Sequence, residues 1–491
     1  MTLDTRPAPK LGFDPAKLPG DLWIGGAWRP GGAGRIEVID PSTGQAVASV
    51  ADASVEDALD AVAAAHAALG PWAATAPRRR SEILRCSFEL MIERREMLAE
   101  LIALENGKAL GDAAGEVTYA AEFFRWFSEE AVRLEGSLSV APSGNNRILV
   151  QHQPIGVAVL VTPWNFPAAM ATRKIAPALA AGCTVVLKPA TETPLTAYVL
   201  AGLFAEAGVP DGVVNVITTT RSGPTVSAML HDPRVRKLSF TGSTPVGRTL
   251  LKDAADQVLS CSMELGGNAP FVVFDDADLD AALDGAMIAK MRNGGEACTA
   301  ANRFIVQEGI LPAFSEGLAA RMSALTVGPG YDPATKVGPM VNARAIETIS
   351  TLVDDAVGRG ARVVIGGKAL DRAGFYFPPT VLDRVPEGAA IGREEIFGPV
   401  AAIRSFATEE EAIATANDTE YGLIAYVYTG DLARGLRVSE RIEAGMVGLN
   451  RGLVSDPAAP FGGVKQSGLG REGAHHGILE FCETKYIAAS W

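Results

Sequence analysis

One cysteine lies in a stretch of small residues that would leave its sulfur accessible to a reactant. Cys298 follows the segment 293–297, which contains glycines and an alanine, between a helical pattern at 279–291 and a strand-like run at 303–306. Glycine permits unusual backbone angles, and small neighbours leave room for a substrate near the thiol. These features favour a nucleophile. The alternative is a small apolar residue at a helix end, because free cysteine is among the most buried residue types.

Two further polar residues lie in rigid or glycine-rich surroundings near strand ends. Asn165 lies between Pro163 and Pro167, so its side-chain amide projects from a fixed backbone and suits an oxyanion donor. Glu264 precedes two glycines at 266–267 and would serve as a general base if it lies near the sulfur. A glutamate in isolation is more often a surface charge.

A glycine-containing turn and a lysine predict a dinucleotide site. The turn 241–247 follows a strand and opens a helix, with Ser243 or Thr244 as its expected cap and Pro245 in its first turn. Free N–H groups at such a helix start attract phosphate. Lys188 follows a predicted strand at the carboxyl edge, where parallel sheets bind ligands. The alternatives are a purely structural turn, which lacks the GxGxxG pattern, and a solvated lysine.

These motifs occur together in a known enzyme family. The chain resembles the aldehyde dehydrogenase superfamily over nearly its whole length. The resemblance depends on the motifs at 162–167, 188–190, 240–243, 264–267, the Cys298 loop, 394–399 and 460–463. Each motif is modest alone, and their common order is specific.

The resemblance implies a thioester mechanism with NAD or NADP as cofactor. The Cys298 thiolate would attack the aldehyde, the Asn165 amide and the Cys298 N–H would hold the oxyanion, and Glu264 would activate the water that releases the acid. Lys174 and Glu472 match positions that the family associates with proton movement. The residues that the resemblance assigns to the cofactor are Thr162, Trp164, Lys188, Thr191, Ser243, Leu265, Glu394 and Phe397.

Three residues resemble the succinate-semialdehyde branch of the family. In that branch, the positions of Arg173, Arg292 and Ser455 hold the far carboxylate of the substrate, and guanidinium and hydroxyl groups suit that role. The alternative is that both arginines pair with surface acids. Differences from the branch at 451–452 and Asp456 keep glutarate semialdehyde and 2-oxoglutarate semialdehyde open beside succinate semialdehyde.

Two other differences from the family pattern affect cofactor choice and regulation. Thr191 lies where strictly NAD-dependent members often carry Glu, so a 2′-phosphate is not repelled and NADP is plausible. Ala300 lies where some members have a second cysteine, so a local disulfide at the nucleophile is not expected.

The order of the predicted elements indicates an α/β fold. Short strands alternate with helices in two series, which predicts two doubly wound parallel sheets. A predicted hairpin at 137–150 lies between helical regions and should pair with the strand-like C-terminal segment as an oligomerisation arm. The expected division is a dinucleotide-binding domain at 1–133 and 154–258, a catalytic domain at 259–469, and the arm at 134–153 and 470–491.

Composition limits the possible functions. The chain has 491 residues and a net charge of −13, which argues against nucleic-acid and anionic-membrane partners. Its 5 cysteines are dispersed without CxxC spacing or matching histidines, so we expect no metal site and a reducing cytoplasm. Residues 1–10 lack the apolar core of a signal peptide. We expect a homo-oligomer, either a dimer or a tetramer. The alternative to a dehydrogenase, from a different functional class, is a redox-silent esterase or a structural protein on the same fold.

Overall fold

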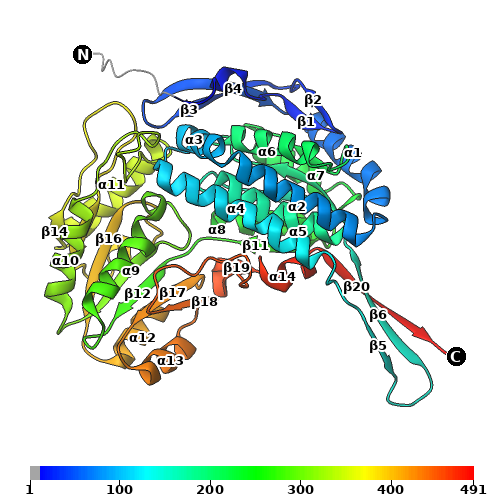
Figure 1. The fold of residues 1–491 in the computed structure, drawn as a ribbon. Coiled ribbons are helices and arrows are strands. Elements are labelled where there is room, and N and C mark those ends of the chain that lie inside the picture. Colours follow the sequence, from blue (N-terminus) through cyan, green and yellow to red (C-terminus); the bar gives the residue numbers. More distant parts are fainter. Residues whose placement is uncertain (1–10) are drawn as a thin grey trace.

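A computed structural model describes residues 11–491; residues 1–10, on which the signal-peptide prediction depends, lie outside the described part of the chain. Two sheets lie at the centres of two α/β units, and a narrow arm projects from the body (Figure 1). This arrangement confirms the predicted α/β class with two units and a hairpin arm.

The first sheet has 8 strands in the order β19-β11-β10-β7-β8-β9-β1-β2. The central strands β7 to β11 run parallel, whereas β1, β2 and β19 pair antiparallel at the two edges. Residues at or just after the carboxyl ends of β7, β10 and β11, namely Pro163, Thr241 and Leu265, line a groove. The strands are β1 (Leu22–Ile24), β2 (Ala27–Arg29), β7 (Val157–Val161), β8 (Thr184–Lys188), β9 (Val214–Val216), β10 (Val235–Thr241), β11 (Ser260–Glu264) and β19 (Gly468–Leu469).

Helices accompany this sheet, and α5 is the one most deeply enclosed. Every residue of α5 is buried, and it contacts both α4 and α6. It begins at Pro167, whose fixed φ suits a first helical turn, and ends at Gly182 with a left-handed φ of 97°. The helices are α1 (Val55–Ala73), α2 (Pro77–Glu93), α3 (Arg95–Asn106), α4 (Leu110–Glu130), α5 (Pro167–Ala181), α6 (Pro194–Glu206), α7 (Ser222–Leu230) and α8 (Thr244–Ala255).

Apolar residues recur at helical spacing over residues 78–105, which predicts one long helix, but this stretch forms two helices. Arg94 leaves the helical conformation, with φ −99° and ψ 18°, between α2 and α3. Its guanidinium makes two hydrogen bonds of 2.7 Å to the carboxylate of Glu206 at the end of α6. Apolar periodicity continues across the break, so the pattern alone did not mark it.

The second sheet has 7 strands in the order β14-β15-β16-β13-β12-β17-β18, with only β14 antiparallel to its neighbour. Its strands are β12 (Ala269–Val273), β13 (Ala301–Gln307), β14 (Arg362–Ile365), β15 (Thr380–Asp383), β16 (Val400–Phe406), β17 (Ile424–Tyr428) and β18 (Met446–Leu449). Its helices are α9 (Leu279–Met291), α10 (Leu311–Ser323), α11 (Ala343–Gly358), α12 (Glu409–Asn417) and α13 (Leu432–Arg441). The Cys298 loop connects α9 to β13, the next strand of this sheet.

The arm is a separate sheet of 3 strands in the order β20-β6-β5. The strands β5 (Ser137–Val140) and β6 (Arg147–Pro154) form the predicted hairpin. As predicted, the C-terminal strand β20 (Cys482–Ala489) pairs with it, along β6. The short helix α14 (Ala474–Leu479) precedes β20 and packs on α4 and α5, and β3 (Gly34–Asp40) and β4 (Gln45–Asp52) form a further pair. Among residues 11–491, no helix is both long and apolar enough to cross a bilayer.

Candidate active site

Cys298 lies in a loop whose backbone reverses sharply after α9. A short 3-10 turn, Arg292–Gly295, follows the helix, and Asn293, Gly294 and Gly295 have φ values of 54°, 59° and 81°. A Cβ atom on Gly295 would lie 2.2 Å from the carbonyl oxygen of Gly398, so a side chain cannot be accommodated there. The glycines predicted to give access to the sulfur therefore serve the close approach of two backbones.

Asn165 contacts this loop through its side chain. Its Nδ2 donates a hydrogen bond of 3.1 Å to the carbonyl oxygen of Glu296, and this acceptor fixes the orientation of the amide. The second N–H of the amide remains available to an oxyanion. In return, Nδ2 of Asn293 donates to the carbonyl oxygens of Asn165 and Glu296, each at 2.9 Å. The structure therefore brings Asn165 and the Cys298 loop together, as the oxyanion hypothesis requires.

A buried ion pair fixes the backbone of Asn165 from the other side. Lys108, between α3 and α4, donates to the carbonyl oxygen of Asn165 at 2.6 Å and to Oε2 of Glu116 at 2.5 Å. The other carboxylate oxygen of Glu116 accepts the first free N–H groups of α5, from Ala168 and Ala169, at 2.8 and 3.2 Å. Sequence reasoning missed both charged residues; their place in the apolar helical pattern was the available signal.

The sulfur of Cys298 lies where two cavities meet. A groove of about 680 Å³ extends on one side, and a smaller cavity of about 290 Å³ on the other; Cys298 and Met170 line both. The groove is lined by Pro163, Trp164, Asn165, Met170, Thr241, Gly242, Ser243, Leu265, Gly266, Cys298, Glu395 and Phe397. A reactant in the small cavity and a ligand in the groove would therefore both reach the sulfur.

The groove contains several of the predicted cofactor residues. Trp164, Ser243, Leu265 and Phe397 line it, and the rings of Trp164 and Phe397 meet edge to face at 5.4 Å. Ser243 occupies the predicted N-cap position of α8, but its side chain makes no capping hydrogen bond. The hydroxyl of Thr244 instead donates to the carbonyl oxygen of Gln466 at 3.2 Å. The first N–H groups of α8 therefore remain free of a side-chain cap.

Three predicted cofactor residues lie beside the groove at the sheet edge rather than in its lining. Thr162 and Lys188 are buried at the ends of the neighbouring strands β7 and β8, and the N–H of Thr162 donates to the carbonyl oxygen of Lys188. Burial lowers the pKa of Lys188, against the opposing charge of Glu192. Thr191 is half-buried and donates to Oε2 of Glu192 at 3.3 Å.

The structure places Glu395, not the predicted Glu394, on the groove. Glu394 is exposed, and its backbone oxygen accepts a hydrogen bond from Asn302. The side chain of Glu395 turns the opposite way, because its Oε1 accepts the N–H of Gly267 at 3.2 Å. Burial raises the pKa of Glu395 to about 8, although Lys290 opposes the shift. The adjacent glutamates could not be distinguished from sequence, since a loop has no fixed side-chain period.

The predicted substrate residues line the small cavity together. Its walls are formed by Tyr119, Phe166, Met170, Arg173, Arg292, Ala297, Cys298, Thr299, Ser455 and Phe461. Arg292 donates to the hydroxyl of Thr299 at 3.2 Å, and the guanidinium of Arg173 lies 4.0 Å from the centre of the Phe461 ring. Nη2 of Arg173 is buried without a hydrogen-bond partner among the described residues. Sequence reasoning missed Tyr119.

A buried acid–base cluster lies behind Arg173. Glu472 forms ion pairs with Nε of Arg173 at 2.5 Å and with Nζ of Lys174 at 2.6 Å. Burial opposes ionisation of Glu472, but Lys174 and Arg173 outweigh it and lower the pKa of this carboxyl. The structure thus joins the two predicted relay residues, Lys174 and Glu472, and adds Arg173 to them.

Glu264 adjoins this cluster and is not part of the lining of either cavity. Its Oε2 is buried without a hydrogen-bond partner among residues 11–491. A Cβ on Gly462 would lie 3.0 Å from its Oε1. Burial, together with the charge of Glu472, raises the pKa of Glu264 well above its usual value, despite Arg173 and Lys174. A carboxylate of raised pKa is a stronger base.

The environment of Cys298 raises the pKa of its thiol. Burial raises the pKa of Cys298 to about 12; the charges of Glu395 and Glu264 add to the shift, and those of Arg173 and Arg292 oppose it. Because the thiolate is the reactive form, the site must remove the thiol proton during reaction. No group of three or more His, Cys, Asp or Glu residues in the described part of the chain is arranged to hold a metal ion.

Comparison with known proteins identifies a family. The model described as "Aldehyde dehydrogenase family" matches residues 28–487. A succinate-semialdehyde dehydrogenase from Paenarthrobacter nicotinovorans is 57% identical over 90% of this chain and 98% of its own. A glutarate-semialdehyde dehydrogenase from Pseudomonas aeruginosa is 47% identical over 95% and 96%. A solved NADP-dependent enzyme from Escherichia coli has a TM-score of 0.95 and 47% identity, covering 96% of this chain and 98% of its own.

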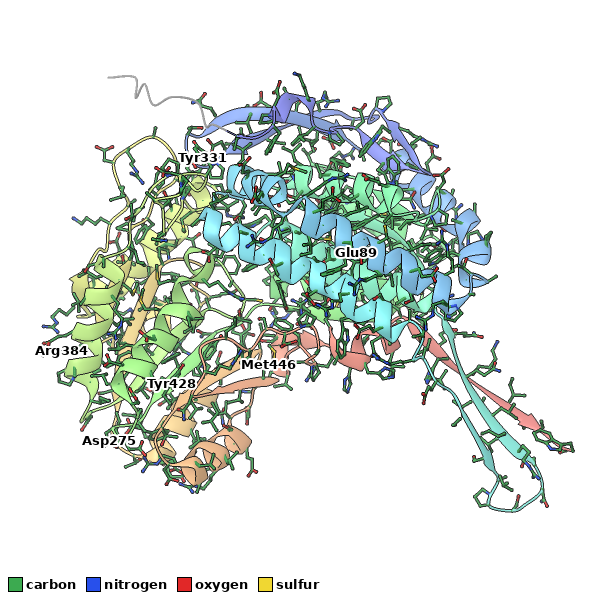
Figure 2. The ribbon with its side chains drawn as sticks, viewed as in Figure 1. Glu89, Asp275, Tyr331, Arg384, Tyr428 and Met446 are labelled. Atoms are coloured by element: carbon green, nitrogen blue, oxygen red, sulfur yellow. The ribbon has the colours of Figure 1, made fainter. Side chains whose placement is uncertain are left out.

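Replacement of Lys108 by Met should destabilise the protein by about 3–5 kcal/mol, because it leaves the buried charge of Glu116 unpaired. The measurement is urea-induced unfolding followed by tryptophan fluorescence. The double variant Lys108→Met/Glu116→Gln should recover part of the loss. As a control, Arg85→Ala removes an exposed pair with Glu89 on α2 (Figure 2) and should cost less than about 1 kcal/mol. Equal effects of the two single substitutions would contradict the role of the buried pair.

Alkylation of Cys298 in the cofactor-free protein should be slow at neutral pH and should accelerate about tenfold per pH unit up to about pH 11. The raised pKa leaves roughly a thousandth of the thiolate that an ordinary cysteine carries. Iodoacetamide labelling, followed peptide by peptide with mass spectrometry, measures this rate, and Cys298→Ser identifies the signal. A rate that reaches its plateau below about pH 9 would contradict the assignment.

Proposed function

The chain belongs to the aldehyde dehydrogenase family, and we propose that it oxidises succinate semialdehyde to succinate with NAD or NADP. The observation that carries this proposal is the small cavity at Cys298, whose lining includes Arg173, Arg292 and Ser455. A four-carbon substrate with an aldehyde at one end and a carboxylate at the other matches a cavity lined by both a nucleophile and cationic donors.

The charges of the cavity support a carboxylate rather than an uncharged substrate. Two guanidinium groups in the lining of one small cavity attract an anion, and planar guanidinium groups match the geometry of a carboxylate. Nη2 of Arg173 has no hydrogen-bond partner in the described part of the chain, so it is available to a ligand. An uncharged aldehyde would leave this buried donor without a partner, at a cost of about 1–3 kcal/mol.

The covalent steps would be performed by Cys298 with donors on both sides of the substrate carbonyl. Attack of the thiolate on the aldehyde carbon gives a thiohemiacetal, whose oxyanion accepts the free N–H of the Asn165 amide and the backbone N–H of Cys298. This backbone N–H makes no hydrogen bond within residues 11–491. Loss of a hydride gives the thioester, and attack by water releases the acid. Donors arranged in advance typically contribute about a hundredfold to a thousandfold in rate each.

Glu264 is the base for both proton removals. Its raised pKa favours acceptance of a proton from the Cys298 thiol and then from the attacking water. The pair of Glu472 and Lys174 lies beside it and provides a path along which a proton can leave the buried carboxyl. Because Oε2 of Glu264 has no fixed partner, its side chain can turn toward the sulfur without breaking a hydrogen bond.

The residues of the groove fit a dinucleotide. The uncapped N-terminus of α8 suits a pyrophosphate, and the buried hydroxyl of Thr241 has no partner among the described residues. Lys188 suits a ribose hydroxyl, with Glu395 in place of Glu394 for the other ribose. The nicotinamide of the bound cofactor supplies the hydride acceptor.

Glutarate semialdehyde is the second candidate substrate. A relative that is 47% identical over 95% of this chain carries that name. The same guanidinium groups would bind its carboxylate, and one additional methylene changes binding by only about 1–3 kcal/mol.

We further propose that the arm mediates a homo-oligomer, a dimer or a tetramer, in the cytoplasm. The arm, including the residues just after β20, exposes large apolar side chains, with Leu138 65%, Tyr486 58% and Trp491 75% exposed. Contiguous exposed apolar groups on a projecting sheet are typical of subunit contacts.

The proposed domain division differs from the predicted one at one boundary. The strands β11 and β19 pair within the first sheet. We therefore propose that the dinucleotide-binding unit includes these two strands beyond the predicted boundary at 258.

Replacement of Arg292 by Ala should raise KM for succinate semialdehyde about tenfold to a hundredfold and leave KM for butanal nearly unchanged. The reason is that a hydrogen bond to a charged group contributes about 1.5–3 kcal/mol, and butanal has the same carbon number without the carboxylate. Initial rates of NADH or NADPH formation measure both substrates with each enzyme. If the wild-type enzyme prefers butanal, or if both KM values rise equally, the substrate proposal is wrong.

Replacement of Thr191 by Glu should raise KM for NADP about tenfold while KM for NAD changes little. The added carboxylate would repel a 2′-phosphate, and Glu192 already contributes one negative charge beside Lys188. Thr191→Gln is the matched control, because it adds the same bulk without the charge. Equal effects of Glu and Gln on NADP would show that size, not charge, governs this position.

A further inference from the structure

The hydroxyl group of Tyr119 is the polar group of the small cavity that remains unexplained. Tyr119 extends from α4 into the lining that also contains Cys298, Arg173 and Arg292. Its Oη atom is buried and has no hydrogen-bond partner among residues 11–491. The ring packs edge to face on Phe123, with centroids 5.0 Å apart, so the position of the hydroxyl is fixed.

Two other deeply buried tyrosines, Tyr426 and Tyr198, use their hydroxyl groups in hydrogen bonds. Tyr426, under the same loop, donates to the carbonyl oxygen of Thr299 at 2.8 Å. Tyr198, in the first unit, lies 2.7 Å from the hydroxyl of Thr218. A buried hydroxyl without a partner costs about 1–3 kcal/mol, and such exceptions often lie at functional sites. The unpaired Oη of Tyr119 therefore indicates an absent acceptor rather than a packing role.

The charges around the cavity define that acceptor. Burial raises the pKa of Tyr119, although Arg173 and Arg292 oppose the shift, so the phenol keeps its proton near neutral pH and donates. Both guanidinium groups also donate and cannot accept. The group that satisfies all three donors at once is an anion with several lone pairs, and a carboxylate offers about four acceptor positions.

We propose that the hydroxyl of Tyr119 donates a hydrogen bond to the far carboxylate of the substrate and thereby helps select carboxylated over uncharged aldehydes. This inference rests on the proposed function and adds a neutral donor to Arg173, Arg292 and Ser455. An uncharged aldehyde leaves the hydroxyl of Tyr119 buried without an acceptor. Such a donor therefore discriminates between carboxylated and uncharged aldehydes more strongly than an apolar side chain would.

The test is Tyr119→Phe, which removes one oxygen and keeps the ring on Phe123. The ratio of kcat/KM for succinate semialdehyde to that for butanal should fall about tenfold to a hundredfold. The change should lie in KM for succinate semialdehyde, because the distal contact is the same in the ground state and the transition state. An unchanged ratio, or an equal fall for both substrates, would overturn the proposal.

Product inhibition gives a readout that is independent of succinate semialdehyde turnover. Succinate presents the same distal carboxylate, so its inhibition constant against butanal oxidation should rise by a similar factor in Tyr119→Phe. The matched control is Tyr198→Phe, which removes an equally buried hydroxyl from outside both cavities and should leave the substrate ratio and the inhibition constant unchanged. An equal rise of the inhibition constant in both variants would assign the effect to general destabilisation and overturn the proposal.

The two proposals fail in distinguishable ways. If the wild-type enzyme shows no preference for succinate semialdehyde over butanal, the substrate assignment fails, and the role of Tyr119 fails with it. If the wild-type preference is present and Tyr119→Phe retains it in full, the role of Tyr119 alone is wrong. Butanal oxidation and the thermal unfolding midpoint of each variant report whether the protein has folded.

Discussion

Asn165 and the loop of Cys298 hold each other through their amide groups, and the geometry of the site depends on this exchange. The side chain of Asn165 donates to the carbonyl of Glu296, and the side chain of Asn293 donates to the carbonyls of both. These residues come from different α/β units, so the contact joins the units at the sulfur. Lys108 and Glu116 then fix the backbone of Asn165 to the start of α5, where the enclosed charges have full hydrogen-bond partners.

The electrostatics around the sulfur explain why the resting thiol and its base have raised pKa values. Burial raises the pKa of Glu264, Glu395 and Cys298, and the negative charges of Glu395 and Glu264 raise that of Cys298 further. The cationic groups Arg173 and Arg292 lie on the substrate side and offset this only in part. Ionisation of the thiol is therefore coupled to proton uptake by a neighbouring carboxyl, which is the property that a nucleophile and its general base require.

Sequence reasoning located the main parts of the site because each lies in a motif with strong local constraints. The prolines around Asn165, the glycines before Cys298 and the alternation of strands and helices all have direct backbone consequences. The residues it missed lack such constraints. Lys108 and Glu116 become important only when α4 packs on α5, and Tyr119 only when α4 reaches the wall of the cavity. The exchange of Glu394 for Glu395 has the same cause, since one residue along an irregular loop reverses the direction of a side chain.

The guanidinium group of Arg173 serves two parts of the site at once. Its Nε pairs with Glu472, whereas its Nη2 is unpaired and the residue lines the small cavity. Loss of Arg173 would remove a donor for a substrate carboxylate and would also remove one of the cations that keep Glu472 ionised beside Glu264. A kinetic change in such a variant would combine substrate binding with proton movement. Arg292 has no acidic partner in the described part of the chain and bonds only to the hydroxyl of Thr299, so it separates the carboxylate contact from the chemistry of the base.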